Sequence, residues 1–202
     1  MIPAGRRLPR SFFGRPSTEV APDLLGRVLV RTLPTGARLL VRLVETEAYQ
    51  DDDPASHSFH GRTARTEVMF GPPGRLYVYF TYGMHFCMNV VTGANGEGSA
   101  VLLRAAEPLE GLAEMRALRG IEDERALCSG PGKLCRALGV DRTNNGDDLV
   151  RGSPLALHEG APVPAGGVEV TPRVGIRRAA ELPWRFVVRG DRFVSRPARV
   201  RG

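Results

Sequence analysis

Two glutamates lie two residues apart at the end of a run with β-strand character, residues 40 to 49. Alternate residues of a strand share a face, so Glu45 and Glu47 are expected to continue the apolar face of Val41 and Leu43. A carboxylate partly removed from water either binds a cation or has a raised pKa, and both conditions are common at a general base. The pattern indicates acid–base chemistry; the alternative is a pair of solvated acids at an exposed strand end.

The acidic loop that follows, residues 51 to 53, suggests a different chemistry. If the turn brought these aspartates beside Glu45 and Glu47, the carboxylates could hold the two metal ions of a nuclease. His57 and His60 have a spacing that metal ligands can use, but a third ligand is missing from this stretch. A solvated loop is the simpler interpretation, and we predict no metal site.

Residues 75 to 91 are rich in β-branched and aromatic side chains and are interrupted at Tyr82 and Gly83. This pattern predicts a β-hairpin, because glycine supplies the positive φ of a tight turn. Tyr82 would then lie at the tip, where a large aromatic side chain exposed to water is unfavourable unless another group packs on it. A nucleic acid can provide such a group, because an inserted side chain separates two stacked bases and packs between them. The alternative is a core hairpin whose tip tyrosine packs on a neighbouring loop.

Composition favours one domain and an anionic partner. The chain has 202 residues, 42% of them hydrophobic, and a formal net charge of +6. Lys133 is the only lysine; the many arginines suit phosphate but also fit a compositional bias of the genome. Three cysteines without a C-x-x-C pair argue against a disulfide framework and a zinc site. With no signal peptide or membrane span in the sequence, we expect a cytoplasmic protein.

The remaining segments predict a mixed α and β chain without repeats or linkers. We expect a mobile basic arm at residues 1–10, short helical turns between residues 17 and 26, and a hairpin of residues 27–33 and 38–49. Helices are predicted at residues 109–120, with an apolar stripe of Leu109, Leu112, Met115 and Leu118, and near Lys133. Short strands are predicted at 155–158, 168–170 and 185–188, and Trp184 is assigned to the core.

Taken together, the segments resemble the alkyladenine (methylpurine) DNA glycosylase family. The resemblance covers residues 8 to 195 in order and is carried by residues 44–49, 55–58, 66–70, 77–79, 82–84, 86–89, 101–105, 107–108, 127–134 and 172–176. The loop between Tyr49 and His57 departs from the family pattern, since it is a residue shorter and more acidic. This departure affects the expected shape of the pocket rim.

The resemblance implies a single α+β domain, a curved and mostly antiparallel sheet with surrounding helices and a protruding, DNA-inserting hairpin. It implies a base-excision-repair glycosylase that flips alkylated or deaminated purines out of duplex DNA and leaves an abasic site. Because Lys133 is the only lysine and strand cleavage generally needs an amine nucleophile, we expect the enzyme to be monofunctional. No cofactor is implied, and we expect a monomer associated with the nucleoid. A catalytically silent DNA-distorting binder and the metal nuclease are the alternatives.

The resemblance also assigns roles to individual residues. Glu47 would activate the attacking water with help from Arg104. The remaining assignments are Tyr49, His57 and Tyr79 as walls for the flipped base, Asn89 as the reader of its minor-groove edge and Tyr82 as the wedge. Independently of the resemblance, Lys133 near a helix start suggests a contact to a DNA phosphate, and Arg173, Arg177 and Arg178 suggest a basic surface that faces the DNA backbone. The alternative for the three arginines is a solvated rim. If Tyr79 and Asn89 line one pocket, the hairpin needs an odd-length turn through Met84 or a bulge. We predict that arrangement.

Overall fold

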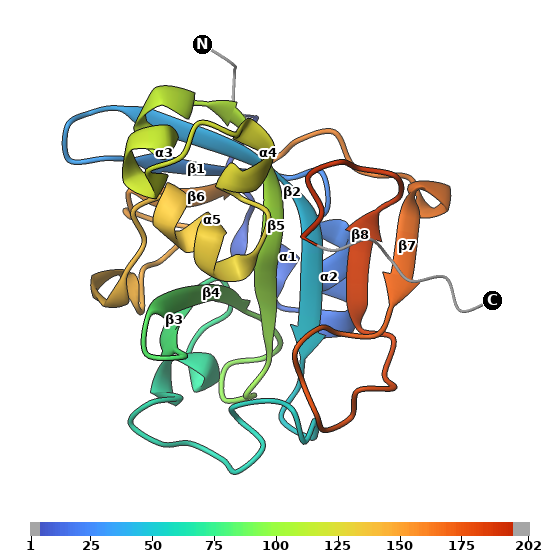
Figure 1. Ribbon diagram of the computed structural model, residues 1–202. Coiled ribbons are helices and arrows are strands. Elements are labelled where there is room, and N and C mark those ends of the chain that lie inside the picture. The colour runs from blue at the N-terminus through green and yellow to red at the C-terminus, as the bar shows by residue number, and fades with distance from the viewer. Residues whose placement is uncertain (1–4, 196–202) are drawn as a thin grey trace.

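The longest strand, β2 (Arg38–Tyr49), is the centre of the sheet in the computed structural model, which describes residues 5 to 195. One edge of β2 pairs with β5 (Ala100–Glu110) along its length. The opposite edge pairs first with β1 (Val28–Thr32) and then with β8 (Arg185–Val188). All of these pairings are antiparallel, and Figure 1 shows β2 running through the middle of the molecule.

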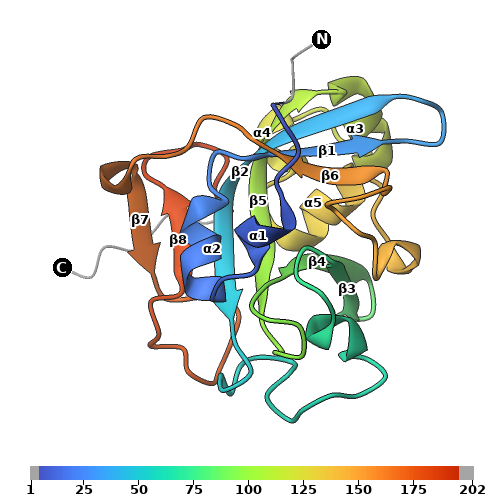
Figure 2. The ribbon, with the colours of Figure 1, turned by 180° about the vertical axis from the view of Figure 1, so that it is seen from behind.

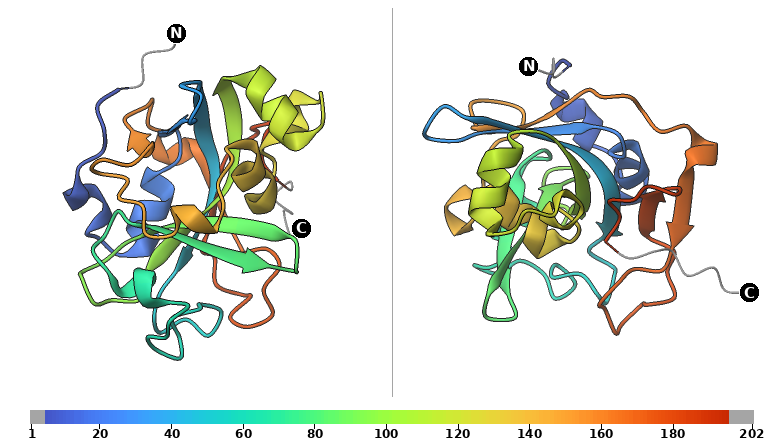
Figure 3. Two further views of the ribbon diagram at one scale, coloured as in Figure 1. Left: turned by 90° about the vertical axis from the view of Figure 1, so that its left-hand side faces the viewer. Right: turned by 45° about the horizontal axis from the view of Figure 1, so that its top comes forward.

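The other strands extend this centre in three directions. β4 (His85–Val91) pairs with β5 and carries β3 (Leu76–Thr81) at its outer edge. β6 (Leu155–His158) pairs with β1, and β7 (Val168–Thr171) pairs with β8. The sheet curls strongly, as both views of Figure 3 show. The predicted α+β class is confirmed, as are the hairpin of β1 and β2 and the three short strands.

Short helices fill the curl and supply much of the core. α2 (Ser17–Asp23), preceded by α1 (Arg10–Phe13), packs on β2, β5 and β8, as Figure 2 shows from behind. α5 (Pro131–Ala137) packs on β4 and β5 and contacts α3 (Leu112–Arg119) and α4 (Glu124–Leu127). In the described part of the chain, three 3₁₀ turns complete the elements: Glu67–Phe70, Arg142–Asn144 and Ala165–Gly167. Within residues 5–195 no helix is long and apolar enough to cross a membrane.

A bulge in β2 reverses the face on which its later side chains lie. The register with β5 shifts on both sides of Glu45, so Val44 and Glu45 point to the same side. Val41, Leu43 and Ala48 belong to the main core, whereas Val44 packs with Ala105 and Phe193 in a separate cluster. The expectation that the glutamates continue the face of Val41 and Leu43 is therefore wrong.

Two smaller expectations also differ from the structure. Residues 1–4 of the predicted mobile arm lie outside the described part of the chain, but the rest of the arm is attached to β6. Arg7 forms a β-bridge with His158, and the Leu8 amide donates to Leu157 while its side chain is buried. Leu109 belongs to β5 rather than to the following helix, because Gly111 in the left-handed region separates the two elements. Trp184 packs against the main core as predicted.

Candidate active site

A cavity of about 360 Å³ lies where the second half of β2 meets the β3–β4 hairpin. Its walls come from β2, β3, β4, β5, the loop at residues 55–57, the start of α5 and the loop at residues 174–176. The predicted site residues that line it are Glu47, Tyr49, His57, Tyr79, Tyr82, Asn89 and Arg104. Lys133, Arg173 and Arg177 lie outside the lining.

Glu47 is fully buried from bulk water and still reaches this cavity. One carboxylate oxygen accepts the Val174 amide at 2.8 Å and lies 3.5 Å from an Arg104 nitrogen. The other oxygen accepts the Tyr49 hydroxyl at 2.9 Å. Burial raises the pKa of Glu47, and Arg104, the Val174 amide and the Tyr49 hydroxyl only partly oppose this effect, so the net shift is upward. A carboxylate of this kind suits proton transfer.

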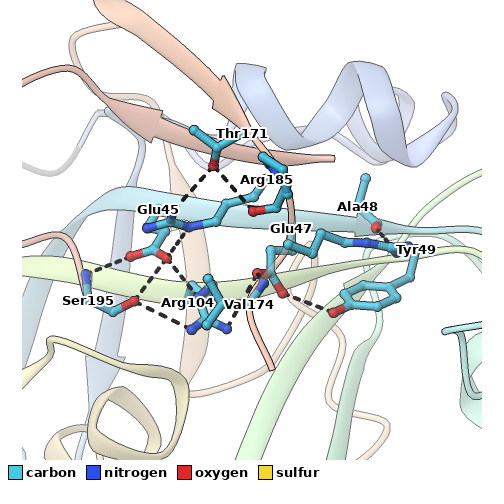
Figure 4. A network of polar contacts seen from close by, with 11 residues as sticks. Glu45, Glu47, Ala48, Tyr49, Arg104, Thr171, Val174, Arg185 and Ser195 are labelled. Carbon is cyan, nitrogen blue, oxygen red and sulfur yellow. Dashed lines mark hydrogen bonds and ion pairs between the residues drawn. The ribbon is translucent and has the colours of Figure 1, made fainter. Parts of the chain in front are cut away.

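Glu45 has the opposite character, although it is just as buried. One of its oxygens accepts hydrogen bonds from Arg104 Nε at 2.7 Å, Arg185 Nε at 2.7 Å and Ser195 Oγ at 2.9 Å. The other oxygen accepts the Ser195 amide at 2.7 Å (Figure 4). Burial would raise the pKa of Glu45, but the two guanidinium groups and the Ser195 amide outweigh it and lower the pKa. Glu45 is therefore a fixed anion.

Aromatic side chains form one wall of the cavity. The rings of His57 and Tyr79 meet edge to face with centroids 4.5 Å apart, and Tyr77 lies 5.7 Å from Tyr79. Nδ1 of His57 lies 3.0 Å from the Tyr77 hydroxyl, and Nε2 lies 3.4 Å from an Arg65 nitrogen. Because arginine only donates, Nε2 is the acceptor and Nδ1 carries the proton. Burial and Arg65 lower the pKa of His57 to about 4, so the ring is neutral near pH 7.

The β3–β4 hairpin brings its polar and aromatic residues to the cavity through its register. Thr81 pairs with His85, which leaves a three-residue turn, and Tyr77 and Tyr79 pair with Asn89 and Cys87. The predicted odd-length turn is confirmed. Asn89 donates from its amide to the Tyr77 carbonyl at 3.2 Å and lines the cavity.

Tyr82 lies in the turn of this hairpin and is 80% exposed. Its φ of 52° and that of Gly83, 67°, are both left-handed, a conformation that is strained for tyrosine. The alternative in which the tip tyrosine packs on a neighbouring loop is wrong, because the side chain is open to solvent. The same residue also lines the mouth of the cavity.

Arg173 is not a contact to the DNA backbone, because its side chain is completely buried. It forms a two-pronged ion pair with Asp53 and donates to the Ala48 carbonyl at 3.0 Å. The guanidinium also lies over the rings of Tyr49 and Trp184, with its central carbon 4.6 Å and 5.2 Å from their centroids. Because Tyr49 lines the cavity, the buried Arg173 stabilises the cavity wall from inside the protein.

The carboxylates proposed for a metal nuclease are not gathered at one place. Asp53 binds Arg173, Glu45 binds Arg104 and Arg185, and the other loop aspartates are exposed. Within residues 5–195 no group of three or more histidines, cysteines, aspartates or glutamates has a metal-binding arrangement. His60 is exposed and does not line the cavity with His57.

The other predicted basic residues lie at the surface. Lys133 is in the first turn of α5 and donates to the Ser129 hydroxyl at 3.2 Å. Arg177 and Arg178 are exposed in the loop that follows Val174.

Several residues of the site could not be found from the sequence. Ser195, Arg185 and the Val174 amide come from parts of the chain more than 120 residues from the glutamates they contact. Arg65 also belongs to the site, but in the sequence only its charge distinguishes it from the other residues of a polar loop. Tyr77, in contrast, can be found from the sequence, because strand alternation places it on the same face as Tyr79.

A family model described as methylpurine-DNA glycosylase (MPG) matches residues 11–192. The chain belongs to this family. A protein of Rhodopseudomonas palustris (strain BisB18) named "Putative 3-methyladenine DNA glycosylase" is 54% identical over 96% of this chain and 92% of its own length. Relatives with the same name from Carboxydothermus hydrogenoformans and Streptomyces avermitilis are 50% and 52% identical, over 94% and 96% of this chain and 98% and 94% of their own. The methylpurine-DNA glycosylase resemblance predicted from the sequence is confirmed.

The Asp53–Arg173 pair gives a prediction about the stability of the protein. Arg173→Met should lower the free energy of unfolding by about 3–5 kcal/mol, because it leaves a buried carboxylate without its cation. Arg177→Met, at an exposed position in the same loop, should change it by less than about 0.5 kcal/mol. Urea unfolding of the two variants measures both values, and equal losses would contradict a buried structural role for Arg173.

Proposed function

We propose that the protein is a monofunctional DNA glycosylase that removes alkylated or deaminated purines from duplex DNA. The observation that carries this proposal is Glu47, a buried carboxylate with a raised pKa at the edge of an aromatic-walled cavity. Membership of the methylpurine-DNA glycosylase family supports damaged purines as the substrate class. The carboxylate and the cavity account for the chemistry.

A base inside a duplex cannot enter a cavity of this kind, so the nucleotide must first be flipped out of the helix. Tyr82 is the proposed wedge, since it is the exposed aromatic side chain at the mouth of the cavity. Inserted through the minor groove, its ring would restore part of the stacking that the flipped base loses. Tyr82 has a left-handed backbone conformation that is strained for tyrosine, and such strain is common at functional positions.

The flipped purine would be held between flat and largely neutral walls. The rings of Tyr49, His57 and Tyr79 line the cavity, and an electron-poor alkylated purine is attracted to π surfaces. Asn89 is held by the Tyr77 carbonyl, so one amide proton remains to face the minor-groove edge of the base. A fixed donor there disfavours the exocyclic amine of normal guanine, which is also a donor.

Hydrolysis breaks the bond between C1′ of the sugar and the purine nitrogen, with oxocarbenium character in the transition state. Glu47 would take a proton from the attacking water, and its negative charge would stabilise the sugar cation. Arg104 would orient the carboxylate together with the Val174 amide, since both lie at the same oxygen of Glu47. The purine leaves with the bonding electrons and the water oxygen becomes bonded to C1′, which gives an abasic site.

Exposed cations would hold the phosphate backbone around this site. Arg177 and Arg178 lie in the loop that also supplies Val174, and Lys133 lies beside Pro131, which lines the cavity. The net charge of +6 favours association with DNA as a whole. We propose that the protein acts as a monomer in the cytoplasm, in association with the nucleoid.

Release of free base from an alkylated duplex in EDTA tests this function, because neither a DNA-distorting binder nor a metal nuclease would release it. Glu47→Gln should lose at least ~10²-fold in single-turnover base release, since it keeps the shape of the side chain but removes the base. Binding to an abasic-site analogue should survive and serves as the control for folding. Base release near the wild-type rate in Glu47→Gln would refute the role of Glu47.

Tyr82→Ala should weaken both binding to lesion-containing DNA and the rate of base release, by up to a few kcal/mol, because the wedge stacking is lost. Val170→Ala is the matched control, since Val170 is exposed on β7, away from the cavity. Lesion affinities measured by fluorescence anisotropy should separate the two variants. Equal affinity of Tyr82→Ala and the wild type would count against the wedge.

The product strand should remain intact until alkali or heat is applied. A glycosylase that also cuts the strand generally uses an amine that forms a Schiff base with the sugar, and arginine cannot serve as that nucleophile. Lys133 is the single lysine, and it lies outside the cavity lining. Borohydride should therefore trap no covalent enzyme–DNA adduct. A trapped adduct that disappears in Lys133→Arg would show that the enzyme is bifunctional.

A further inference from the structure

Arg104 is shared between two buried carboxylates that have different surroundings. Its Nε donates to Glu45 at 2.7 Å, while a terminal nitrogen lies 3.5 Å from Glu47. The guanidinium is therefore held more closely by the residue that does not line the cavity. Figure 4 shows Arg104 between the two acids.

Glu45 is itself held by groups that the proposed reaction does not use. Arg185 and Ser195 donate to it from β8 and from the segment that follows β8, and Arg185 also donates to the Thr171 hydroxyl at 3.2 Å. These contacts fix the position of the Glu45 carboxylate. The β2 bulge turns Glu45 and Glu47 together to the side that faces Arg104.

The charges explain why such an arrangement is useful. A buried carboxylate paired only with one guanidinium would be held as an unreactive anion by the strong attraction in a low-dielectric interior. A second carboxylate on the same guanidinium takes up part of that attraction. We propose that Glu45 is a positioning residue that holds Arg104 and offsets its charge, so that Glu47 remains an effective base toward the attacking water.

This inference rests on the proposed function, because it assigns the role of general base to Glu47. The titratable and charged groups around Glu47 come from four strands: Arg104 on β5, Glu45 and Tyr49 on β2, Tyr79 on β3 and Cys87 on β4. Among them only Arg104 and Glu45 are charged near neutral pH, since burial raises the pKa of Tyr49, Tyr79 and Cys87. The opposing charges of Arg104 and Glu45 therefore control the acid limb of the pH–rate profile, which is the pH range in which base release slows as Glu47 becomes protonated.

The test is the pH dependence of single-turnover base release by three variants on one lesion-containing duplex. Glu45→Gln removes an anion, so the acid limb should move to lower pH by about one pH unit and the plateau rate should fall, because Glu47 becomes a weaker base. Arg185→Gln removes a cation that competes for Glu45, so the limb should move in the opposite direction. Thr171→Val removes a hydrogen bond of the same network without a change of charge and should leave the limb in place.

The opposite shifts separate this role from a structural one, which would lower the plateau without moving the limb. Circular dichroism identifies variants that are not folded. If Glu45→Gln does not fold, a comparison of the acid limbs of Arg185→Gln and Thr171→Val still tests the proposal. Coincident acid limbs in the wild type and the folded charge variants would overturn the proposal. A limb that persists in Glu47→Gln would instead contradict the proposed function, so the two failures are distinguishable.

Discussion

The site depends on the ion pairs that the buried guanidinium of Arg104 forms with two carboxylates. A cation removed from water needs carboxylates around it, and both carboxylates come from a single strand, at Glu45 and Glu47. They lie on the right side of that strand only because the bulge at Val44 reverses the alternation. A strand of regular pleat would have directed the same two acids into the apolar core.

The bulge also coincides with a change of partner along one edge of β2. Before the bulge this edge pairs with β1, and after it the edge pairs with β8, which brings Arg185 beside Glu45. The change of strand partner and the register shift that turns Glu45 and Glu47 thus fall at the same part of β2. Bulges near active sites often redirect side chains in this way.

Two loops that contribute to the cavity wall are joined by a second buried ion pair. Asp53 lies in the acidic loop and Arg173 precedes the amide of Val174 that binds Glu47. The acidic loop therefore supports the site through Asp53, while Asp51 and Asp52 are exposed to solvent. Stability and catalytic geometry are linked through this pair, since its loss would free both loops.

The sequence by itself determined the local elements and the family. Alternation and turn residues predicted the β1–β2 hairpin and the three short strands, because these features depend on neighbours along the chain. The odd-length turn of the β3–β4 hairpin followed from the family resemblance, which requires Tyr79 and Asn89 to line one pocket. Only the tertiary structure decided the face of Glu45 and Glu47 and the burial of Arg173. A bulge, a change of strand partner and an ion pair across 120 residues are set by contacts between distant segments, which leave no periodic signal in the chain.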